Sequence, residues 1–191
     1  MELRLIRDAF DDPGYIFELK HDGFRGVAYV ESGKCSLVSR RQRRLKFPSL
    51  AAALGKLRVE NAILDGEIVC LDESGVSQFN RRLSRKAEPV FYAFDLLWLD
   101  GEDLRELPLI ERKQRLAQLV QTSACSRLLY AQHVEAAGKQ LFQEICSRDL
   151  EGIVAKRSRS IYRASRSAWL KIKNHSYSQA EGRHELLTNR K

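Results

Sequence analysis

A glutamate, a lysine and an arginine near the start of the chain could together hold an anionic group. Glu18 and Lys20 alternate with apolar residues and therefore point to the same side of a strand. Arg25 follows just beyond Asp22-Gly23, a pair that is typical of a tight turn. A lysine at the end of an apolar strand, with a carboxylate and a guanidinium close by, is unusual for a solvated face. Chance placement on a surface strand is the alternative.

Two lysines near the other end of the chain form a second group of this kind. Lys171 and Lys173 share one side of a short strand with Trp169, opposite Leu170 and Ile172. Two ammonium groups stacked on one strand face repel each other unless an anion lies between them. The alternative is an exposed edge strand whose lysines protect it from aggregation.

Two carboxylates interrupt the apolar segment 62–71, which reads A-I-L-D-G-E-I-V-C-L. Asp65 and Glu67 lie on one side of this strand under ideal alternation. Burying a carboxylate costs free energy unless it is hydrogen-bonded, paired or bound to a metal. Either residue is therefore a candidate for a site, unless Asp65 simply marks a turn or a bulge.

Apolar periodicity predicts the elements that must position these residues. Residues 1–12 receive no assignment, 75–89 is expected to be a mobile loop, and 90–99 is expected to be a largely buried strand. Strands mixed with helices, without regular alternation, predict an α+β architecture. The strands are expected at 15–20, 24–30, 34–40, 62–71, 90–99, 151–156 and 168–174, and the helices near 48–57, 109–120 and 139–146.

Composition limits the class of protein rather than its activity. Hydrophobic residues make up 43% of the 191 residues and charged residues 30%, an ordinary mixture for a globular domain. The net charge of +8 favours polyanionic partners such as nucleic acid or nucleotide. The basic run 40–44 could accordingly be a phosphate-contacting loop or a solvated turn.

Neither a membrane segment nor an oxidising compartment is indicated. No apolar run reaches the roughly 18 residues that span a bilayer, and the N-terminus is too short and too charged for a signal peptide. We therefore expect a cytoplasmic protein without a membrane partner. The cysteines lack C-x-x-C spacing, so reduced, buried thiols are expected rather than disulfides or a metal site. They are Cys35, Cys70, Cys125 and Cys146.

A series of motifs in a fixed order resembles the covalent nucleotidyltransferases, meaning ATP-dependent DNA and RNA ligases and capping enzymes. Lys20 to Arg25 reads K-H-D-G-F-R and is similar to the K-x-D-G-x-R signature of that family. The closest likeness is to the ligase domain of bacterial end-joining DNA ligases. The family's later motifs are matched by S-R at 39–40, D-G-E at 65–67, F-Y-A-F-D at 91–95, E-G-I-V-A-K at 151–156 and L-K-I-K at 170–173.

The resemblance implies a fold and a domain organisation. Residues 1–174 would form a nucleotidyltransferase domain of the ATP-grasp-like type, with antiparallel sheets flanked by helices around a central nucleotide cleft. Residues 175–191 would be a basic tail, too short for the OB-fold domain that typical ligases append. Arg41-Gln42 stands where related bacterial ligases usually have Asn-Gly, so this loop could differ in shape or in DNA contact.

The resemblance also implies a catalytic group. Lys20 would attack the α-phosphorus of ATP and form a lysine-AMP phosphoramidate. Only the neutral amine is nucleophilic, and a lysine with a pKa of ~10.4 is neutral in about one part in a thousand at pH 7.4. Arg25, Lys171, Lys173 and a divalent cation would lower that pKa by repulsion. Lys171 and Lys173 would also hold the α-phosphate and stabilise the charge that develops on it.

The base of the nucleotide is expected to meet two residues. Glu18 would accept a hydrogen bond from the adenine amino group, and Phe94 would stack on the ring. Because its whole segment is apolar, Phe94 could also be ordinary core. Lys156 belongs to a matching motif without a definite role. His21 occupies a variable position and is not expected to be catalytic.

The sugar, the phosphates and a metal ion are expected to meet the remaining motif residues. Arg25 and Glu67 would bind the ribose hydroxyls. Arg40 would bind the sugar or the phosphates. Glu151 would bind or orient Mg²⁺ or Mn²⁺, hard cations that are usually held by few carboxylates together with phosphates and water.

The implied function is an ATP-dependent adenylyltransferase that passes AMP to a 5′-phosphorylated end and seals nicked or broken double-stranded DNA. A separate OB-fold or an end-joining repair protein could act with it. One alternative is a catalytically weak or inactive ligase-like module that holds nucleic acid in DNA repair. Another is an RNA ligase or a GTP-dependent capping-type enzyme.

Overall fold

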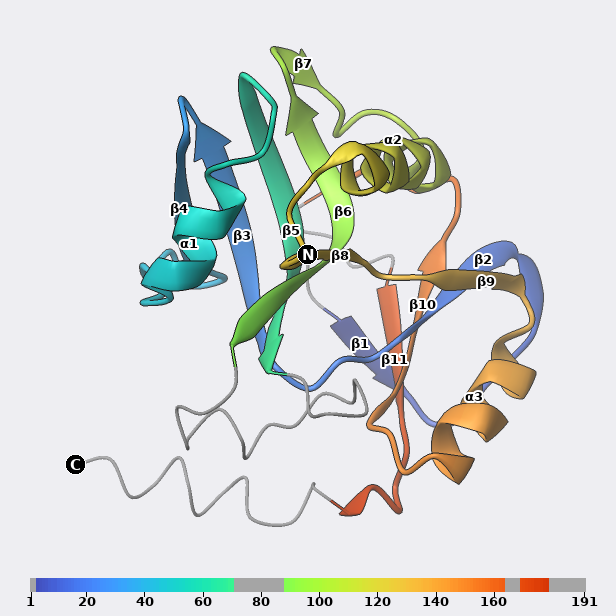
Figure 1. Ribbon diagram of the computed structural model, residues 1–191. Coiled ribbons are helices and arrows are strands. Elements are labelled where there is room, and N and C mark those ends of the chain that lie inside the picture. Colours follow the sequence, from blue (N-terminus) through green and yellow to red (C-terminus); the bar gives the residue numbers. More distant parts are fainter. Residues whose placement is uncertain (1–2, 71–87, 164–168, 179–191) are drawn as a thin grey trace.

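Two β-sheets and three helices make up the part of the chain that the computed structural model describes, which is residues 3–70, 88–163 and 169–178 (Figure 1). The expected α+β architecture is confirmed, and most neighbouring strands are antiparallel. We call the two sheets sheet A and sheet B. Each has its own apolar core, and side chains from both line the same pocket.

Sheet A contains the strands that carry the predicted lysines. One of its faces packs against the helix α3 (Gly138–Ser147) through an apolar core that includes Phe17, Ile145 and Ile172. The helix α3 is amphipathic, as its sequence predicts. Its apolar side covers the apolar face of sheet A, which would otherwise be exposed to water. In spatial order the strands are β1 (Leu3–Ile6), β11 (Trp169–Lys173), β10 (Gly152–Arg157), β2 (Asp12–Leu19) and β9 (His133–Ala136), with β1 parallel to β11.

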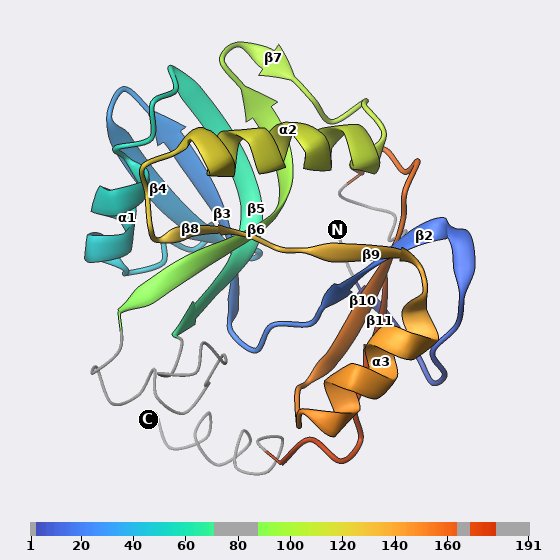
Figure 2. The ribbon, with the colours of Figure 1, turned by 45° about the vertical axis from the view of Figure 1, so that its right-hand side comes forward.

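Sheet B is covered by the other two helices. The helix α1 (Pro48–Leu54) starts with proline at its first turn, where the missing N–H costs nothing. The helix α2 (Leu109–Thr122) packs against β6 and β8 (Figure 2). In spatial order the strands are β4 (Lys34–Ser39), β3 (Phe24–Glu31), β5 (Asn61–Cys70), β6 (Pro89–Leu99) and β7 (Glu102–Asp103), with β8 (Leu128–Tyr130) parallel to β6.

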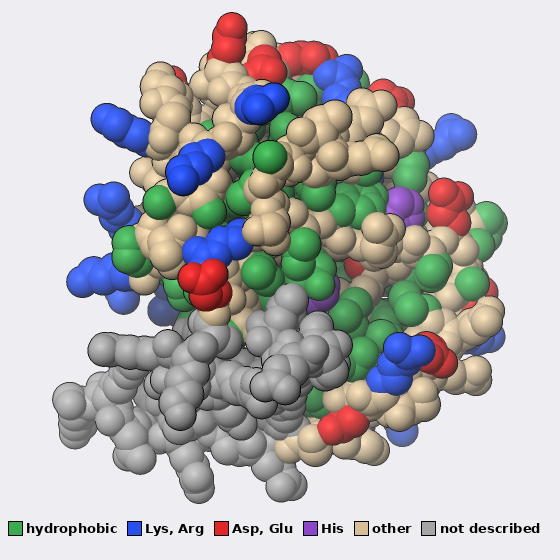
Figure 3. Space-filling view, viewed as in Figure 1, with side chains coloured by type: hydrophobic (Ala, Val, Ile, Leu, Met, Phe, Trp, Pro, Cys, Tyr) green, Lys and Arg blue, Asp and Glu red, His purple; other side chains and the backbone are tan. Residues whose placement is uncertain are grey.

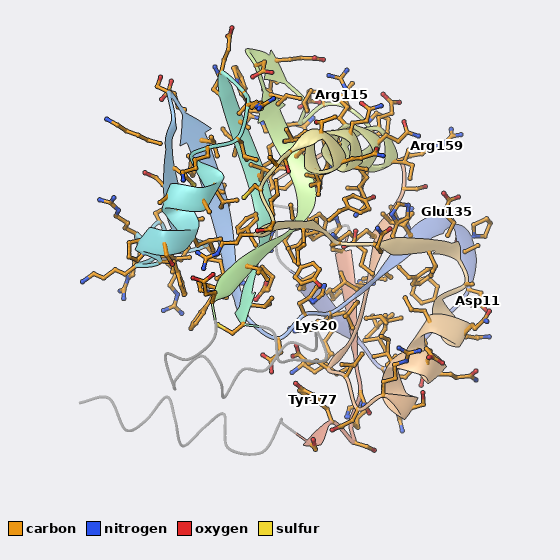
Figure 4. The ribbon with its side chains drawn as sticks, in the orientation of Figure 1. Asp11, Lys20, Arg115, Glu135, Arg159 and Tyr177 are labelled. Atoms are coloured by element: carbon orange, nitrogen blue, oxygen red, sulfur yellow. The ribbon has the colours of Figure 1, made fainter. Side chains whose placement is uncertain are left out.

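The turn after Lys20 joins the two sheets instead of closing a hairpin. The strand β2 pairs with β10 and β9, whereas β3 pairs with β4 and β5. The backbone N–H of Lys20 donates to the carbonyl of Gly152, and the buried carboxylate of Asp22 accepts from the hydroxyl of Tyr177 at 3.2 Å. The turn therefore holds Lys20 at the junction of the sheets, as Figure 4 shows.

A bulge in β6 sets the direction of Phe94. The register between β5 and β6 pairs Asp65 with Asp95 but Gly66 with Ala93, so Phe94 is the extra residue on its strand. A bulge bends a strand locally and re-aims a side chain. While Ala93 is buried in the core of sheet B, Phe94 packs beside Trp169 of sheet A and lines the pocket. Ideal alternation in the sequence could not predict this.

The helix α2 buries two adjacent cations. Arg112 and Lys113 are both fully buried. The guanidinium group of Arg112 donates to both carboxylate oxygens of Asp95, at 2.7 and 2.8 Å, and to the carbonyls of Leu107 and Ser160. This pairing ties α2 to β6 and to the segment that follows β10. Breaking one member of such a buried pair leaves the other charged and unpaired.

Several expectations about the elements need correction or extension. The segment 1–12, which was unassigned, contains β1, and the sequence patterns also miss β7, β8 and β9. The strand β11 lies between β1 and β10, so the edge-strand interpretation of its lysines is wrong. Most of the loop expected at 75–89 lies outside the described residues, as do residues 179–191 of the expected tail.

The cysteines and the membrane expectation can be compared with the structure directly. All four cysteines are free thiols, of which Cys70 is buried and the other three are partly exposed. The expectation of reduced thiols is consistent with this, but full burial holds for Cys70 alone. No helix within the described ranges is long and apolar enough to cross a membrane.

We predict that Arg112→Met lowers the free energy of unfolding by about 3–5 kcal/mol, because the buried carboxylate of Asp95 loses its cation. Urea unfolding followed by circular dichroism measures this. Arg115→Met on the same helix is the matched control. Arg115 is partly exposed and pairs with Glu102, so its loss should cost about 1 kcal/mol or less. Equal stability of the two variants would contradict the prediction.

Candidate active site: a charged pocket between the two sheets

A pocket lies where the two sheets meet, and both contribute side chains to it. From sheet A and the turn after it come Glu18, Lys20 and Lys156, and from sheet B come Arg25 and Glu67. Apolar walls are supplied by Leu3, Leu19, Phe94, Ala131, Val154 and Trp169, and His21 completes the lining. A concave site with apolar walls and a few converging charges is the usual form of a small-molecule site.

Cross-strand pairing arranges the predicted residues of sheet A in three rows on its cleft face. Residues directly opposite each other in antiparallel strands lie on the same face. The rows are Lys20, Gly152 and Lys173; Glu18, Val154 and Lys171; and Ile16, Lys156 and Trp169.

The close approach of β10 to β11 requires glycine at position 152. Gly152 has φ +142°, and a Cβ atom there would lie 2.1 Å from the carbonyl oxygen of Ile172.

Lys20 is paired with the carboxylate predicted to bind metal. Its Nζ donates to Oε2 of Glu151 at 2.6 Å, and the side chains are 19% and 5% exposed. The backbone N–H of Asn174 donates to the carbonyl of Glu151, which ties this residue to the segment after β11. The predicted nucleophile is thus partly sheltered and lies at a carboxylate that can accept a proton from it.

The other cations of the cleft affect the pKa of Lys171. Partial burial lowers the pKa of Lys171, and Lys173 and Lys20 lower it further by repulsion. Glu151 opposes this shift, whereas Arg40 adds to it. The expected grouping of Lys20 with Lys171 and Lys173 is therefore present, and an anion bound among them would relieve the repulsion.

Glu18 is buried between two lysines. Lys113 donates to its Oε1 and Lys156 donates to its Oε2, both at 2.5 Å. Burial acts to raise the pKa of Glu18, but the two ammonium groups outweigh it and lower that pKa below its ordinary value. Glu18 is therefore an ionised acceptor that faces the pocket, as its predicted role requires.

Lys156 lies against the aromatic wall of the pocket. Its Nζ is 4.3 Å from the ring centroid of Phe94 and 4.1 Å from that of Trp169. Burial lowers the pKa of Lys156 to about 8, although Glu18 opposes the shift. Phe94 borders the pocket and belongs to the small apolar cluster with Val154 and Trp169, so it is more than ordinary core of sheet B.

Arg25 is held at the pocket by a carboxylate of the next strand. Its Nε and Nη2 donate to the two oxygens of Asp65, at 3.1 and 2.7 Å, and the hydroxyl of Tyr162 donates to the same carboxylate. The guanidinium carbon lies 5.5 Å from the ring centroid of Phe94 and 5.4 Å from that of Trp169. Asp65 therefore orients Arg25 and does not itself line the pocket.

Glu67 borders the same pocket beside Arg25, its partner in the register of β3 and β5. Burial raises the pKa of Glu67 to about 8, and Glu151 and Asp65 add to the rise, while Lys20 and Arg25 oppose it. In the absence of a ligand this carboxyl group is mostly protonated at pH 7. A protonated carboxyl group can donate as well as accept, which suits contact with hydroxyl groups.

Arg40 is not in this pocket. It lines an adjacent hollow, which also takes in Arg25, Tyr29, Arg41 and Tyr162. Figure 3 shows Lys and Arg side chains gathered along the side of the molecule formed by β4 and α1. A contact of Arg40 with a phosphate or sugar thus requires a ligand that extends from one hollow into the other.

The loop after Arg40 forms a tight turn although Gln42, and not glycine, occupies it. Gln42 has φ +58°, a conformation in which glycine or asparagine is favoured. The turn is closed by hydrogen bonds from the backbone N–H of Gln42 to the carbonyl of Ser39 and from that of Ser39 to the carbonyl of Arg43. Arg41 and Gln42 are exposed, and the turn forms with these residues in place.

The described residues offer little to a metal ion on their own. No group of three or more His, Cys, Asp or Glu side chains in these ranges could hold one. Mg²⁺ is commonly held by one or two carboxylates plus phosphates and water. Glu151 therefore fits an ion that a nucleotide brings into the site and does not fit a permanent protein cage.

Comparisons with known proteins identify the family of the chain. A model of the ATP dependent DNA ligase domain matches residues 3–173. The chain belongs to the ATP-dependent DNA ligase family. The matched range includes every residue of the pocket and both lysines of β11.

Two curated members of the family illustrate the likeness. The multifunctional non-homologous end joining protein LigD of Pseudomonas aeruginosa is 35% identical over 167 residues, which cover 83% of this chain and 20% of LigD. The SPbeta prophage-derived DNA ligase-like protein LigB of Bacillus subtilis is 30% identical over 190 residues, 94% of this chain and 68% of LigB. The chain thus spans about a fifth of LigD and about two thirds of LigB.

Solved structures of ligase domains share the fold. The ligase domain of M. tuberculosis LigD superposes with a TM-score of 0.78 at 29% identity, covering 90% of this chain and 58% of that domain. The mycobacterial DNA ligase D complexed with ATP and MES gives a TM-score of 0.77 at 30% identity, covering 90% of this chain and 60% of that one. The expected nucleotidyltransferase fold is confirmed.

Two contributors to the site were missed by sequence reasoning. Lys113 pairs with Glu18 from α2, and Trp169 forms an aromatic wall. A signal for Lys113 existed, because Lys113 and Arg112 lie at helical spacing between Leu109 and Leu116, on the buried side of the helix. Charges on an apolar stripe indicate buried partners, but the sequence does not say which.

We predict that the free energy of unfolding of the ligand-free wild type, minus that of Glu67→Gln, falls as the pH rises. The pKa of Glu67 in the folded chain, about 8, is above its ordinary value of 4.5, so the folded state binds this proton more tightly. Its contribution is complete below about pH 4.5 and is lost as the pH rises through about 8. Urea unfolding at pH 5.5, 7.0 and 8.5, roughly spanning this window, measures the difference.

Glu135→Gln is the matched control for this experiment. Glu135 is exposed on β9, away from the pocket lining (Figure 4). Its substitution should leave the pH dependence of the free energy of unfolding like that of the wild type. If Glu67→Gln also runs parallel to the wild type, Glu67 titrates in its ordinary range and the prediction is wrong.

Proposed function

We propose that this chain transfers AMP from ATP to its own Lys20 and then to the 5′-phosphate of a DNA end, the first two steps of DNA sealing. The observation that supports this best is the pairing of Lys20, a residue of the pocket lining, with Glu151, on a face of sheet A that also carries Lys171 and Lys173. Membership of the ATP-dependent DNA ligase family supports the same activity. Completion of sealing is part of the proposal.

The first step requires Lys20 to lose its charge. The ammonium group gives up one proton, for which the carboxylate of Glu151 is the nearest acceptor at 2.6 Å. The neutral amine attacks the α-phosphorus, and the N–P bond forms as the bond from that phosphorus to the bridging oxygen breaks. Its electron pair leaves with pyrophosphate. The nitrogen then loses a second proton and remains as the phosphoramidate.

Negative charge that develops on the α-phosphate is expected to meet Lys171 and Lys173. Both share the cleft face with Lys20. Partial burial lowers the pKa of Lys171, and repulsion from Lys173 and Lys20, which an anion would relieve, lowers that pKa further. Mg²⁺ or Mn²⁺ bound by the nucleotide would neutralise phosphate charge and polarise the reacting phosphorus. Glu151 is the carboxylate proposed to orient that ion once Lys20 is modified.

The nucleotide is expected to place its base in the pocket. Glu18 would accept from the amino group of adenine, and Phe94 would stack on the base, in a contact worth roughly 1–3 kcal/mol in comparable sites. Arg25 and Glu67, which border the pocket from sheet B, would meet the ribose hydroxyls. Lys156 would remain near the base through its bond to Glu18.

We predict that incubation with ATP and Mg²⁺ gives an AMP adduct on Lys20 and that Lys20→Ala abolishes it. Intact-protein mass spectrometry followed by peptide mapping detects the adduct. Lys139→Ala, which removes an exposed lysine of α3, is the control and should react like the wild type. A wild type that binds ATP without forming an adduct would contradict the proposal.

The last step of sealing is tested separately with a pre-adenylated nick. This substrate bypasses reaction at Lys20, so Lys20→Ala should seal it as well as the wild type does. Nicked double-stranded DNA is the substrate class proposed, and an OB-fold protein or an end-joining repair protein supplied in trans is the proposed partner. If neither protein seals this nick, with or without such a partner, the chain does not complete ligation.

We predict that Arg41→Ala weakens binding to nicked double-stranded DNA and reduces its dependence on salt. Arg41 lines the hollow beside the pocket and is exposed on the loop after β4. One phosphate contact contributes about 0.9 to the slope of log K against log salt concentration, so the slope should fall by about that amount. Fluorescence anisotropy at several salt concentrations measures it.

Arg148→Ala is the matched control for the DNA experiment. Arg148 follows α3, is largely exposed and pairs with Glu144, so it lies outside both hollows. Its substitution should leave the slope unchanged. Equal slopes for Arg41→Ala and the wild type would show that this loop does not contact the DNA backbone.

A further inference from the structure

Lys113 is a fully buried cation that does not line the nucleotide pocket. Its ammonium group donates to Oε1 of Glu18 at 2.5 Å and to the carbonyl of Ala131 at 2.8 Å, and it lies 4.4 Å from the ring centroid of Tyr130. A buried lysine costs free energy unless it is paired, so these contacts fix its position. It acts on a ligand through the residues that it holds, of which Glu18 and Ala131 line the pocket.

Lys113 and Lys156 bind the carboxylate of Glu18 from two different elements. Lys113 comes from α2 and binds one carboxylate oxygen, whereas Lys156 comes from β10 and binds the other. A carboxylate held at both oxygens has a fixed plane. Lys156 also lines the pocket and contacts its aromatic wall, whereas Lys113 lies outside the lining and holds Glu18 and the carbonyl of Ala131.

Because Glu18 is held as an anion, it can bind only a purine that presents a hydrogen-bond donor to it. An ionised carboxylate only accepts hydrogen bonds, whereas a protonated one can also donate. A purine with an amino group at C6 offers a donor. A purine with an oxo group at C6 offers an acceptor, which would leave two acceptors facing each other in a buried site.

We propose that Lys113 is a positioning residue that makes the site selective for a 6-amino purine over a 6-oxo purine, by keeping Glu18 anionic and fixed in direction. The inference deepens the proposed function and rests on the nucleotide occupying this pocket. Without Lys113, Glu18 would keep only Lys156 and could rotate or take up a proton. It could then donate to a 6-oxo group.

The test compares equilibrium binding of ATP and inosine triphosphate to the full chain. The two differ at C6, which carries an amino or an oxo group, and in the proton at N1. Binding is measured by quenching of tryptophan fluorescence, since Trp169 lines the pocket, and without divalent cation so that no adduct accumulates. This readout does not depend on reaction at Lys20, so it can fail or succeed independently of the proposed function.

The preference of the wild type for ATP is expected to fall at least about tenfold in Lys113→Met. Most of the change should be weaker ATP binding, with inosine triphosphate binding unchanged or tighter. Glu18→Gln should show a similar loss, and the double variant should be no worse than either, because the two residues act as one unit. Lys113→Arg, which restores a cation, should recover part of the preference.

Arg115→Met on the same helix is the matched control and should retain the full preference for ATP. If Lys113→Met does not fold, as judged by thermal melting, Lys113→Gln carries the test, since it keeps a donor for the carbonyl of Ala131. An equal loss of affinity for both nucleotides would mean that Lys113 only braces the fold and would overturn the inference. A wild type that binds both equally would also overturn it.

Discussion

Charges of both signs share a small and poorly solvated volume on the cleft face of sheet A, and their mutual compensation is the constraint on which the site depends. Lys20 is balanced by Glu151 and Lys156 by Glu18. Lys171 remains under repulsion from its neighbours. A cluster with an excess of positive charge and room for a ligand favours the binding of an anion. A bound anion would relieve the repulsion among these lysines.

The charged residues that neutralise one another come from elements far apart in the sequence. The carboxylate of Glu18 depends on α2 for one of its cations and on β10 for the other. Arg25 depends on β5, because Asp65 holds its guanidinium group. Glu18 and Arg25 are thus each held by a residue outside the pocket lining, Lys113 and Asp65, which is how a protein pre-organises a polar site before binding.

Joining two sheets across one turn explains why the pocket has two kinds of wall. The chain leaves sheet A after Lys20 and enters sheet B at Phe24, so residues close in sequence approach the ligand from two sides. The bulge in β6 then brings Phe94 from sheet B against Trp169 of sheet A. Aromatic and cationic groups therefore meet at the boundary between two separate apolar cores.

The sequence by itself determined the faces of individual strands and the identity of most reactive groups. Alternation placed Glu18 with Lys20 and Lys171 with Lys173, because the period of a strand is independent of its neighbours. The order of the motifs indicated the family and so the pocket that Glu67 and Lys156 share with Lys20. Helices with a clear apolar stripe were predicted for the same local reason.

Only the tertiary structure decided which groups neutralise one another and which side chains are re-aimed. The pairing of Lys113 with Glu18 joins residues 95 positions apart, and no local pattern specifies a partner at that distance. The parallel strand β1 and the bulge at Phe94 depend on contacts with strands that come later or earlier in the chain. Local periodicity reports burial, whereas pairing, register and charge balance follow from long-range packing, which the sequence encodes only through the complete fold.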